Sequence, residues 1–222
     1  MANRKTLIIS ELFFSIQGES TFAGLPCSFI RLSGCNLCCS YCDARYANEE
    51  EGKILSIDEI AASIHPGPLV EITGGEPLLQ PNVYSLIEEL LAAGKTVLIE
   101  TNGSMPISAI PLEATVIMDI KCPDSGSVSL HPDNIEAIKR RAIQRKVSTE
   151  IKFVLSSFRD YAWAKEILLE NELPAFAPVL LSPVKNLLPI QDLANAILRD
   201  GLPVRLQLQL HTLIWPEILR GV

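Results

Sequence analysis

The chain has 222 residues, of which 48% are hydrophobic, and a formal net charge of −7 at pH 7. This length suffices for one α/β domain with a substantial core and is too short for two comfortable ones, so we expect a single domain over residues 1–222. The acidic balance argues against non-specific binding to nucleic acid or anionic membrane, because both require a basic surface.

No run of about 18 apolar residues is present to span a bilayer. The apolar stretch at residues 7–9 is too short for a signal peptide. We therefore expect a cytoplasmic protein. In a reducing compartment, the six cysteines favour metal ligation over disulfide bonds.

Apolar alternation and turn residues predict strands and helices that alternate along the chain. Strands are expected at residues 7–16, 27–32, 69–73, 96–100, 115–120, 149–155, 177–181 and 204–210. Helices are expected from Ser56, in a capping box with Glu59, through Ile64, from Pro81 to Gly94, and at 132–146, 158–170 and 189–200. This alternation implies parallel βαβ units, hence an α/β open sheet or partial (β/α) barrel of about six to seven mostly parallel strands.

The segments that follow several predicted strands are polar or rich in glycine. They are residues 33–43, 74–77, 100–103, 119–121 and 182–185, with 49–52 reading as a solvated acidic turn elsewhere. The carboxyl ends of parallel strands form the active-site edge of barrels and open sheets. We therefore expect the five segments to converge on one mouth.

Four of the six cysteines lie within eight positions, at Cys35, Cys38, Cys39 and Cys42. The spacing of Cys35, Cys39 and Cys42 lets one irregular loop turn three thiolates toward one point, which suits a metal ion or an iron–sulfur cluster. Three ligands would leave one iron of a four-iron cluster open to an outside molecule. Structural zinc is the alternative, although adjacent Cys38 and Cys39 rarely both reach one ion and zinc sites usually pair two separated knuckles. We predict that Cys38 is not a ligand.

Other positions leave two interpretations open. Arg31 on a buried strand is costly unless it meets an anion, so it is either a structural ion pair or a carboxylate binder. Gly18 either belongs to an ordinary turn or lets the backbone approach a ligand closely. Cys27 and Cys122 are expected to be core thiols.

The cysteine motif, with Tyr41 just before its last member, resembles the signature of the radical S-adenosylmethionine enzymes. The resemblance implies a [4Fe-4S] cluster on the three cysteines, with the amino and carboxylate groups of S-adenosylmethionine on the fourth iron. An electron passed through the cluster then yields a 5′-deoxyadenosyl radical. The Gly-Gly-Glu-Pro segment at 74–77 resembles the second motif of these enzymes, whose backbone receives the amino group of S-adenosylmethionine.

Longer segments are similar to the 7-carboxy-7-deazaguanine synthase family. They are residues 14–19, 29–32, 42–43, 72–77 and 209–211, so the resemblance covers essentially the whole chain. It implies a shortened radical S-adenosylmethionine barrel that acts as a homodimer in queuosine and deazapurine biosynthesis. The reaction implied is the conversion of 6-carboxy-5,6,7,8-tetrahydropterin to 7-carboxy-7-deazaguanine and ammonia, begun by hydrogen abstraction from C6. A reductant protein such as flavodoxin or ferredoxin would supply the electron.

The resemblance also implies a role for each matching residue. The pterin substrate would contact Ile16, Gln17, Gly18, Arg31, Thr73 and the terminal carboxylate of Val222. S-adenosylmethionine would contact Tyr41, Cys42, Asp43, Gly75, Asp119, Ile120, Lys121, Ser182, Pro183, Val184 and Lys185. For Asp119 and Lys121 a purely structural buried ion pair is the alternative. No side chain is expected to act as a nucleophile, because the cluster and S-adenosylmethionine carry the chemistry.

Two positions depart from the family pattern. Ala44 stands where a hydroxyl residue usually binds Mg²⁺, and a methyl group offers no oxygen to a hard cation. A Mg²⁺ ion would therefore bind through substrate and water, or be absent. Thr212 replaces a common lysine after His211, which we interpret as the loss of a peripheral contact.

Two other functions share parts of this pattern. Activating enzymes for glycyl-radical proteins share the cysteine motif and a similar size, but they need a groove for a protein loop and no convergence of Gln17 and Arg31 on a pterin. A structural zinc or iron–sulfur binding module would have no affinity for S-adenosylmethionine.

Overall fold

The computed structural model describes residues 5–144 and 149–222. Its strands are β1 (Thr6–Ile16), β2 (Pro26–Leu32), β3 (Lys53–Ser56), β4 (Leu69–Gly74), β5 (Thr96–Thr101), β6 (Thr115–Asp119), β7 (Thr149–Leu155), β8 (Val179–Pro183) and β9 (Arg205–Leu206). Its helices are α1 (Tyr46–Glu49), α2 (Ile57–Ser63), α3 (Val83–Ala92), α4 (Asn134–Gln144), α5 (Phe158–Glu170), α6 (Ile190–Asp200) and α7 (Leu210–Ile214). Short 3₁₀ turns occur at η1 (Pro77–Leu79), η2 (Pro123–Ser125) and η3 (Leu173–Ala175).

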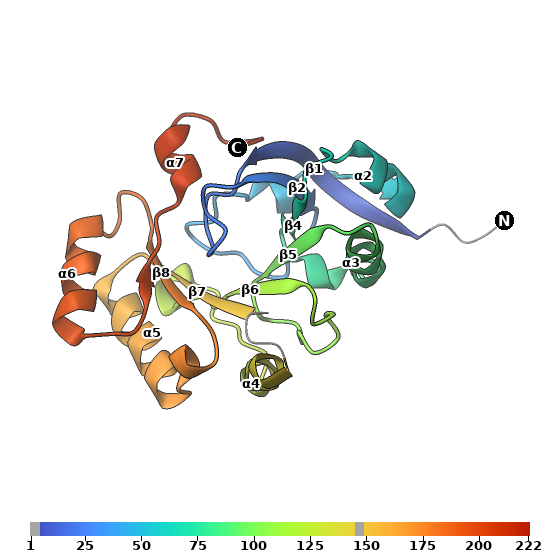
Figure 1. Cartoon of the computed structure of the whole chain (residues 1–222). Coiled ribbons are helices and arrows are strands. Elements are labelled where there is room, and N and C mark those ends of the chain that lie inside the picture. The colour runs from blue at the N-terminus through green and yellow to red at the C-terminus, as the bar shows by residue number, and fades with distance from the viewer. Residues whose placement is uncertain (1–4, 145–148) are drawn as a thin grey trace.

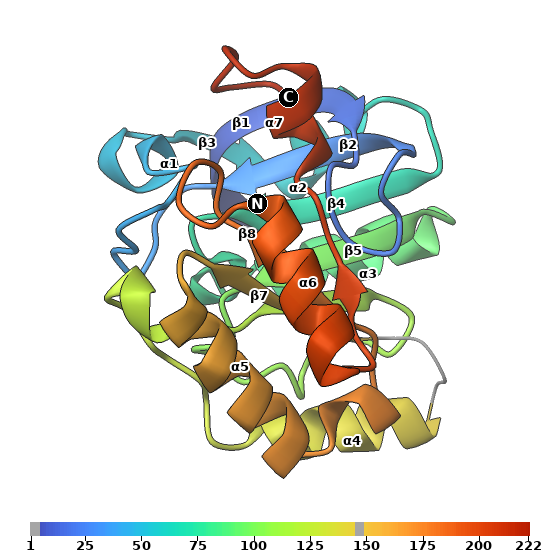
Figure 2. The same cartoon turned by 90° about the vertical axis from the view of Figure 1, so that its left-hand side faces the viewer.

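The strands of the described part form one sheet in the order β3-β1-β2-β4-β5-β6-β7-β8-β9. Strands β2 and β4 to β9 pair in parallel with one another, whereas β1 is antiparallel to both β2 and β3. The sheet curls around an open interior, and α2 to α6 lie on its outer side (Figures 1 and 2). The predicted partial barrel of mostly parallel strands is confirmed, with nine strands among the described residues in place of six to seven.

Strand β7 shows how the two faces of the sheet differ. Every residue of this strand is buried. Ile151 and Phe153 belong to the main apolar core. Lys152 alternates with them, because successive side chains of a strand point to opposite faces, and it lines the interior cavity. Parallel sheets covered on both sides have this continuous burial.

A smaller apolar cluster lines the inner side of the sheet. It consists of Cys27, Phe29, Leu69, Leu98 and Ile117, with Phe13 and Phe22 packed against it. Cys27 is fully buried in this cluster and Cys122 is fully buried in the main core, as predicted for both thiols.

The helix signals were reliable where local chemistry sets the boundary. Ser56 and Glu59 form the predicted capping box at the start of α2. Helix α5 spans the predicted residues, with the Ser157 hydroxyl accepting hydrogen bonds from two backbone N–H groups of its first turn. Gly94 and Gly201 end α3 and α6 with positive φ values of 74° and 58°.

Several boundaries differ from the prediction. Helix α3 begins at Val83, two residues beyond Pro81, and α4 begins at Asn134; positions 145 and 146 of that predicted helix lie outside the described residues. Strand 177–181 is shifted to Val179–Pro183, and strands 96–100 and 115–120 end one residue away from the predicted end. These shifts concern only the ends of the elements. The apolar pattern predicts that a strand or helix is present better than it predicts the residues at which it begins and ends.

The sheet differs from the prediction at both edges, where β3 was not predicted and the last strand is shorter than expected. The short edge strand β3 follows the acidic segment at 49–52 and leaves Ile54 68% exposed, so it lacks the apolar pattern of an interior strand. The strand expected at 204–210 is reduced to Arg205–Leu206. Beyond it the chain leaves the sheet, and the Gln209 side chain donates a hydrogen bond to Glu19 at 3.0 Å.

Within the described ranges, none of the helices has the length and apolar run that crossing a bilayer requires.

Candidate active site

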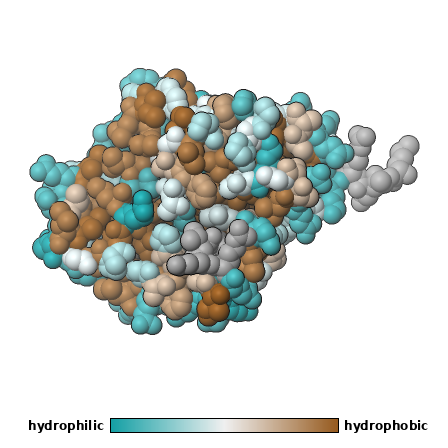
Figure 3. Space-filling model, viewed as in Figure 1, coloured by the Kyte–Doolittle hydropathy of each residue, from teal (hydrophilic) through white to brown (hydrophobic). Residues whose placement is uncertain are grey.

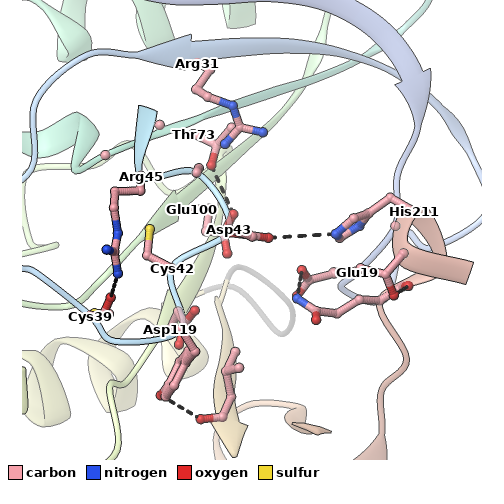
Figure 4. A pocket seen from close by; sticks show the side chains of 18 of the residues that line it. Glu19, Arg31, Cys39, Cys42, Asp43, Arg45, Thr73, Glu100, Asp119 and His211 are labelled. Atoms are coloured by element: carbon pink, nitrogen blue, oxygen red, sulfur yellow. Dashed lines mark hydrogen bonds and ion pairs between the residues drawn. The ribbon is translucent and has the colours of Figure 1, made fainter. Parts of the chain in front are cut away.

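A cavity of about 420 Å³ opens at the carboxyl ends of the strands. All five of the segments that were expected to converge contribute to its lining, together with the end of β1 and the C-terminal residues. Figure 4 shows side chains from these separate elements facing one space. The active-site edge of the barrel is therefore hollow and lined by charged side chains among apolar ones, while the small apolar cluster fills the interior farther from this edge.

Most of the residues assigned by resemblance line this cavity. From the substrate set they are Ile16, Gln17, Gly18, Arg31, Thr73 and Val222; from the other sets they are Cys35, Cys39, Tyr41, Cys42, Asp43, Gly75, Asp119, Lys121, Val184 and Lys185. Ile120, Ser182 and Pro183 are not part of the lining and are buried. The Ile120 side chain belongs to the main core, so only its backbone faces the neighbouring strand end.

The cysteine loop connects β2 to α1 and is fixed by its backbone. The N–H of Gly34 donates to the carbonyl of Ala47 at 2.9 Å, and the N–H of Cys35 donates to Asn48 Oδ1 at 2.9 Å. Arg45 donates to the carbonyl of Cys39 at 3.3 Å (Figure 4). The three predicted ligand thiols thus come from one anchored loop at the cavity wall.

The cysteine loop does not present the ligand arrangement of a single structural zinc ion. In the part of the chain that the structure describes, no three His, Cys, Asp or Glu side chains are grouped as they would be around one metal ion. A four-iron cluster spaces its thiolate ligands more widely than a single ion does, and Cys35, Cys39 and Cys42 all border the cavity.

The Gly74–Gly75 pair packs against the cysteine loop. A Cβ on Gly75 would lie 2.1 Å from the carbonyl oxygen of Gly34, and one on Gly74 would lie 2.3 Å from that of Leu32. Gly74 also has a φ of 144°. The pair is therefore required for the close approach of the two segments, because any side chain would push the loop away.

The next residue of this motif, Glu76, joins two strand ends. Its buried carboxylate accepts hydrogen bonds from Thr101 Oγ1 at 2.9 Å and from the N–H of Asn102 at 2.7 Å. Asn102 in turn donates to Asn36 Oδ1 at 3.1 Å in the cysteine loop. Asn102 lines the cavity beside Cys35 and was not among the predicted site residues.

A buried ammonium group lies at the centre of the polar interior. Lys152 Nζ lies 2.7 Å from Glu19 Oε2, pairs closely with Glu100, and lies 3.4 Å from Asp119 Oδ2. Burial alone would lower the pKa of Lys152, and the surrounding carboxylates raise it well above its usual value instead. Burial would likewise raise the pKa of Glu100, and the Lys152 ammonium instead lowers it to about 2. Both groups are therefore charged.

Lys152 was not among the predicted site residues, and of its partners only Asp119 was. A signal was present, because Lys152 lies between Ile151 and Phe153 in a predicted strand, as Arg31 lies between Ile30 and Leu32. A charge in such a position is costly unless paired, and this implies carboxylates opposite it. Which carboxylates they are follows only from the sheet order.

The Asp119 side chain combines the two interpretations offered for it. Its Oδ2 forms an ion pair with Lys121 Nζ at 2.7 Å. Its Oδ1 is buried and, among the described residues, has no hydrogen-bond partner, and the same is true of Ser182 Oγ. Buried acceptors without a partner are rare. Asp119 lines the cavity, so its Oδ1 suits a polar ligand that enters there, whereas Ser182 lies behind the lining.

Arg31 projects from β2 toward the cavity, as Figure 4 shows. Its Nε donates to Glu11 Oε1 at 3.0 Å, and the same oxygen accepts the Tyr46 hydroxyl at 2.6 Å. Within the described ranges, neither Nη atom of Arg31 forms a hydrogen bond or ion pair. Arg31 is thus ion-paired along one edge and keeps the bidentate edge that a carboxylate requires.

The loop after β1 packs against the C-terminal residues. The side-chain amide of Gln17 donates to Glu71, and burial raises the pKa of this carboxyl well above its usual value. A Cβ on Gly18 would lie 2.4 Å from His211 Nδ1. Gly18 therefore allows the loop after β1 to pack closely against another segment, as one interpretation predicted. That segment is α7 of the protein itself and not a ligand.

The position after the Cys42–Asp43 pair carries no oxygen ligand. Ala44 lines the cavity and is 9% exposed. The neighbouring Asp43 side chain is 70% exposed and lies 3.8 Å from His211 Nε2.

Comparison with known proteins agrees with this site. The sequence profile of the Radical SAM superfamily matches residues 29–121. The partial barrel and its three-cysteine loop define a radical S-adenosylmethionine enzyme. The chain is 42% identical to the 7-carboxy-7-deazaguanine synthase of Chlorobaculum tepidum over all of both chains, and 41% identical to that of Koribacter versatilis over 96% of this chain and 99% of the relative. It belongs to the 7-carboxy-7-deazaguanine synthase family.

Solved structures show the same fold. The crystal structure of QueE from Escherichia coli matches with a TM-score of 0.73 and 24% identity, over 92% of this chain and 94% of that one. Streptococcus suis SuiB bound to S-adenosylmethionine matches with a TM-score of 0.54 and 15% identity, over 83% of this chain and 51% of that one. The family membership replaces the two alternatives considered from the sequence, a glycyl-radical activating enzyme and a structural metal-binding module.

The charge on Glu100 makes stability depend on pH. Because the pKa of Glu100 is lowered from 4.5 to about 2, its contribution is fully present above pH 4.5 and is lost as the pH falls toward 2. We expect Glu100→Gln to reduce the free energy of unfolding by about 2–3 kcal/mol at pH 6, and this difference to shrink by about half or more between pH 5 and pH 3. Urea unfolding of both proteins across this range measures it.

The exposed variant Glu88→Gln is the control for a general effect of removing one carboxylate. A Glu100→Gln difference that stays constant from pH 6 to pH 3 would show that Glu100 is not held ionised by Lys152.

Proposed function

We propose that this cavity converts 6-carboxy-5,6,7,8-tetrahydropterin to 7-carboxy-7-deazaguanine and ammonia, the reaction of its family. The observation that carries the proposal is that Arg31, with its bidentate edge free, borders the same cavity as Cys35, Cys39 and Cys42. A carboxylate-bearing substrate on Arg31 would thus lie within one enclosed space with the cluster site.

Cys35, Cys39 and Cys42 would hold a [4Fe-4S] cluster, and Cys38 would remain outside it. The bound cluster and S-adenosylmethionine supply a 5′-deoxyadenosyl radical. The unpartnered Asp119 Oδ1 supports a polar ligand beside the cluster, and Gly75 lines the same cavity. Ser182 would contribute from behind the lining. Tyr41, Asp43, Ile120, Lys121 and residues 183–185 complete the proposed contacts with S-adenosylmethionine.

The protein's own task is to position the pterin and to exclude water. Arg31 would bind the substrate carboxylate through its two Nη atoms. Ile16, Gln17, Gly18 and Thr73 would contact the pterin ring. The side chains of Gln17 and Thr73 are already fixed by Glu71 and Glu100, so each meets the substrate in one orientation. Val222, which lines the same cavity, would contact the substrate at the rim.

We propose that any Mg²⁺ in this enzyme binds through substrate and water and not through the side chain at position 44. The methyl group of Ala44 offers no ligand. The neighbouring Asp43 carboxylate points toward His211 in Figure 4, with 3.8 Å between Oδ2 and Nε2. A cation held in this way would assist the reaction less than one held by the protein.

An anaerobic assay tests the reaction and the cation together. Reconstituted protein with reductant, S-adenosylmethionine and the carboxytetrahydropterin should form both 5′-deoxyadenosine and 7-carboxy-7-deazaguanine, which mass spectrometry detects. We expect Mg²⁺ to change the rate by no more than about threefold, a barrier change below about 1 kcal/mol. Deoxyadenosine without the deazaguanine would reject this substrate, and an absolute Mg²⁺ requirement would contradict the role given to Ala44.

The cysteine assignment has an internal control. We expect Cys35→Ala, Cys39→Ala and Cys42→Ala each to abolish the cluster's absorbance after reconstitution. Each change removes one of the only three thiolates by which the protein would hold the cluster. Cys38→Ala should retain the cluster and its four iron atoms, measured by iron and sulfide analysis. Loss of the cluster in Cys38→Ala would contradict the assignment.

The partners we propose are a small reductant protein of the flavodoxin or ferredoxin type and a second copy of the chain. Cys38 and Asn36 are exposed, which leaves the cluster edge open to an electron donor. Apolar surface gathers where Figure 1 draws α6 and α7 (Figure 3), with Ile190, Leu198 and Leu213 44%, 78% and 53% exposed. Patches of this kind mark interaction sites.

Sedimentation equilibrium tests the homodimer. At micromolar concentration we expect the mass of two chains, and we expect Leu198→Glu to shift the distribution toward one chain because it adds a charge to the apolar patch. A single-chain mass for the unaltered protein would contradict the proposal.

A further inference from the structure

The last residues of the chain form a strap across the mouth of the cavity. This C-terminal strap, residues 209–222, leaves the sheet after β9, forms α7 and ends beside β1 (Figures 1 and 2). Trp215, Leu219 and Val222 are among its residues that line the cavity. The strap therefore forms one wall of the space in which substrate would bind.

The beginning of the strap is tied to the loop after β1. The N–H of Leu210 donates to the carbonyl of Gly18 at 2.9 Å. Gln209 Nε2 donates to Glu19 Oε1 at 3.0 Å. This end is thus joined to the segment that also carries Gln17.

The far end of the strap is tied to the opposite side of the mouth. The Arg220 guanidinium makes a two-pronged ion pair with Glu50, with Nη1 3.0 Å from Oε2. The same guanidinium lies over the ring of Tyr46, 4.2 Å from its centroid. Glu50 follows α1, the helix directly after the cysteine loop.

Tyr46 connects this end of the strap to the proposed substrate-binding arginine. Its hydroxyl donates to Glu11 Oε1 at 2.6 Å, and that oxygen also accepts from Arg31 Nε at 3.0 Å. The Arg31 guanidinium is 5.9 Å from the centroid of the same ring. One aromatic side chain therefore contacts a guanidinium of the strap and a guanidinium of the cavity wall.

We propose that Arg220 and Glu50 form a latch, with Tyr46 as its platform, that positions the C-terminal strap over the bound substrate. Tyr46 and Glu11 act as positioning residues for Arg31. The substrate part of this inference rests on the proposed function, since it takes Arg31 to bind the substrate carboxylate. Closure of the strap and occupation of Arg31 are then coupled through one ring and one carboxylate.

The latch has the properties of a closure that opens again. Arg220 and Glu50 are 51% and 55% exposed, and exposed ion pairs are weak and screened by salt. The bidentate geometry and the stacking on Tyr46 nevertheless select one closed position. Two further polar contacts hold the first half of the strap, His211 Nε2 3.8 Å from Asp43 Oδ2 and Lys185 Nζ 3.3 Å from the carbonyl of Thr212. The second half exposes Ile218 and Leu219, so little apolar burial resists opening at the end that Arg220 holds.

Hydrogen exchange tests the latch without relying on turnover. In the holoenzyme we expect Arg220→Ala to speed amide exchange in residues 213–222 by about three- to tenfold, the scale of one such exposed pair. The charge exchange Glu50→Arg with Arg220→Glu should restore most of the protection. Arg199→Ala is the matched control. Arg199 is an exposed arginine whose Nε lies 2.9 Å from Asp200 Oδ1, and this ion pair is not part of the cavity lining.

Kinetics of the same variants test the coupling. We expect Arg220→Ala to raise the KM for the carboxytetrahydropterin by about fivefold with a smaller change in kcat, and Arg199→Ala to leave both unchanged. Tyr46→Phe keeps the ring and removes the bond to Glu11, so it should raise the KM while exchange of the strap stays near that of the unaltered protein.

The outcomes separate the latch from the reaction. Unchanged exchange in Arg220→Ala would overturn the latch even if the pterin is turned over. Faster exchange in a protein that does not turn over the pterin would support the latch and reject the proposed substrate. An unchanged KM in Tyr46→Phe would overturn the link between Tyr46 and Arg31.

Discussion

The buried ammonium of Lys152 is the interaction on which the interior of this barrel depends. Lys152 lies on β7, every residue of which is buried, and its ammonium pairs with Glu19, Glu100 and Asp119 from three other parts of the chain. Removing one partner of such a group leaves a charge in a low-dielectric space at a cost of several kcal/mol. The polar floor of the cavity is therefore a single electrostatic unit that fixes Thr73 through Glu100.

That unit is positioned by the order of the strands. Parallel pairing places Asp119 beside Lys152, because β6 and β7 are neighbours in register. The Gly74–Gly75 pair then allows the end of β4 to touch the cysteine loop, and Glu76 joins β4 to the end of β5. The cluster loop, the glycine motif and the charged floor are thus parts of one packed edge, which explains why a polar cavity can exist inside an otherwise apolar fold.

The sequence carried the fold and much of the site, and the reasons are local. Cysteine spacing, the capping box at Ser56 and the paired glycines each constrain a few adjacent residues, so a single sequence reveals them. What it could not reveal depends on tertiary pairing: Asn102 reaching Asn36, Glu50 meeting Arg220 across 170 residues, and the chain leaving the sheet after Leu206. Arg31 lies between these cases. The sequence indicated that Arg31 needs an anion, but it did not indicate that Glu11 and the ring of Tyr46 are its neighbours.

A crystal structure of the anaerobic protein with the cluster, S-adenosylmethionine and the carboxytetrahydropterin would test this account most directly. The account predicts the substrate carboxylate on the Nη atoms of Arg31, and a polar group of S-adenosylmethionine on Asp119 Oδ1. It also predicts Arg220 seated on Tyr46 above them. A substrate carboxylate bound elsewhere in the cavity, with Arg31 still paired only to Glu11, would contradict it.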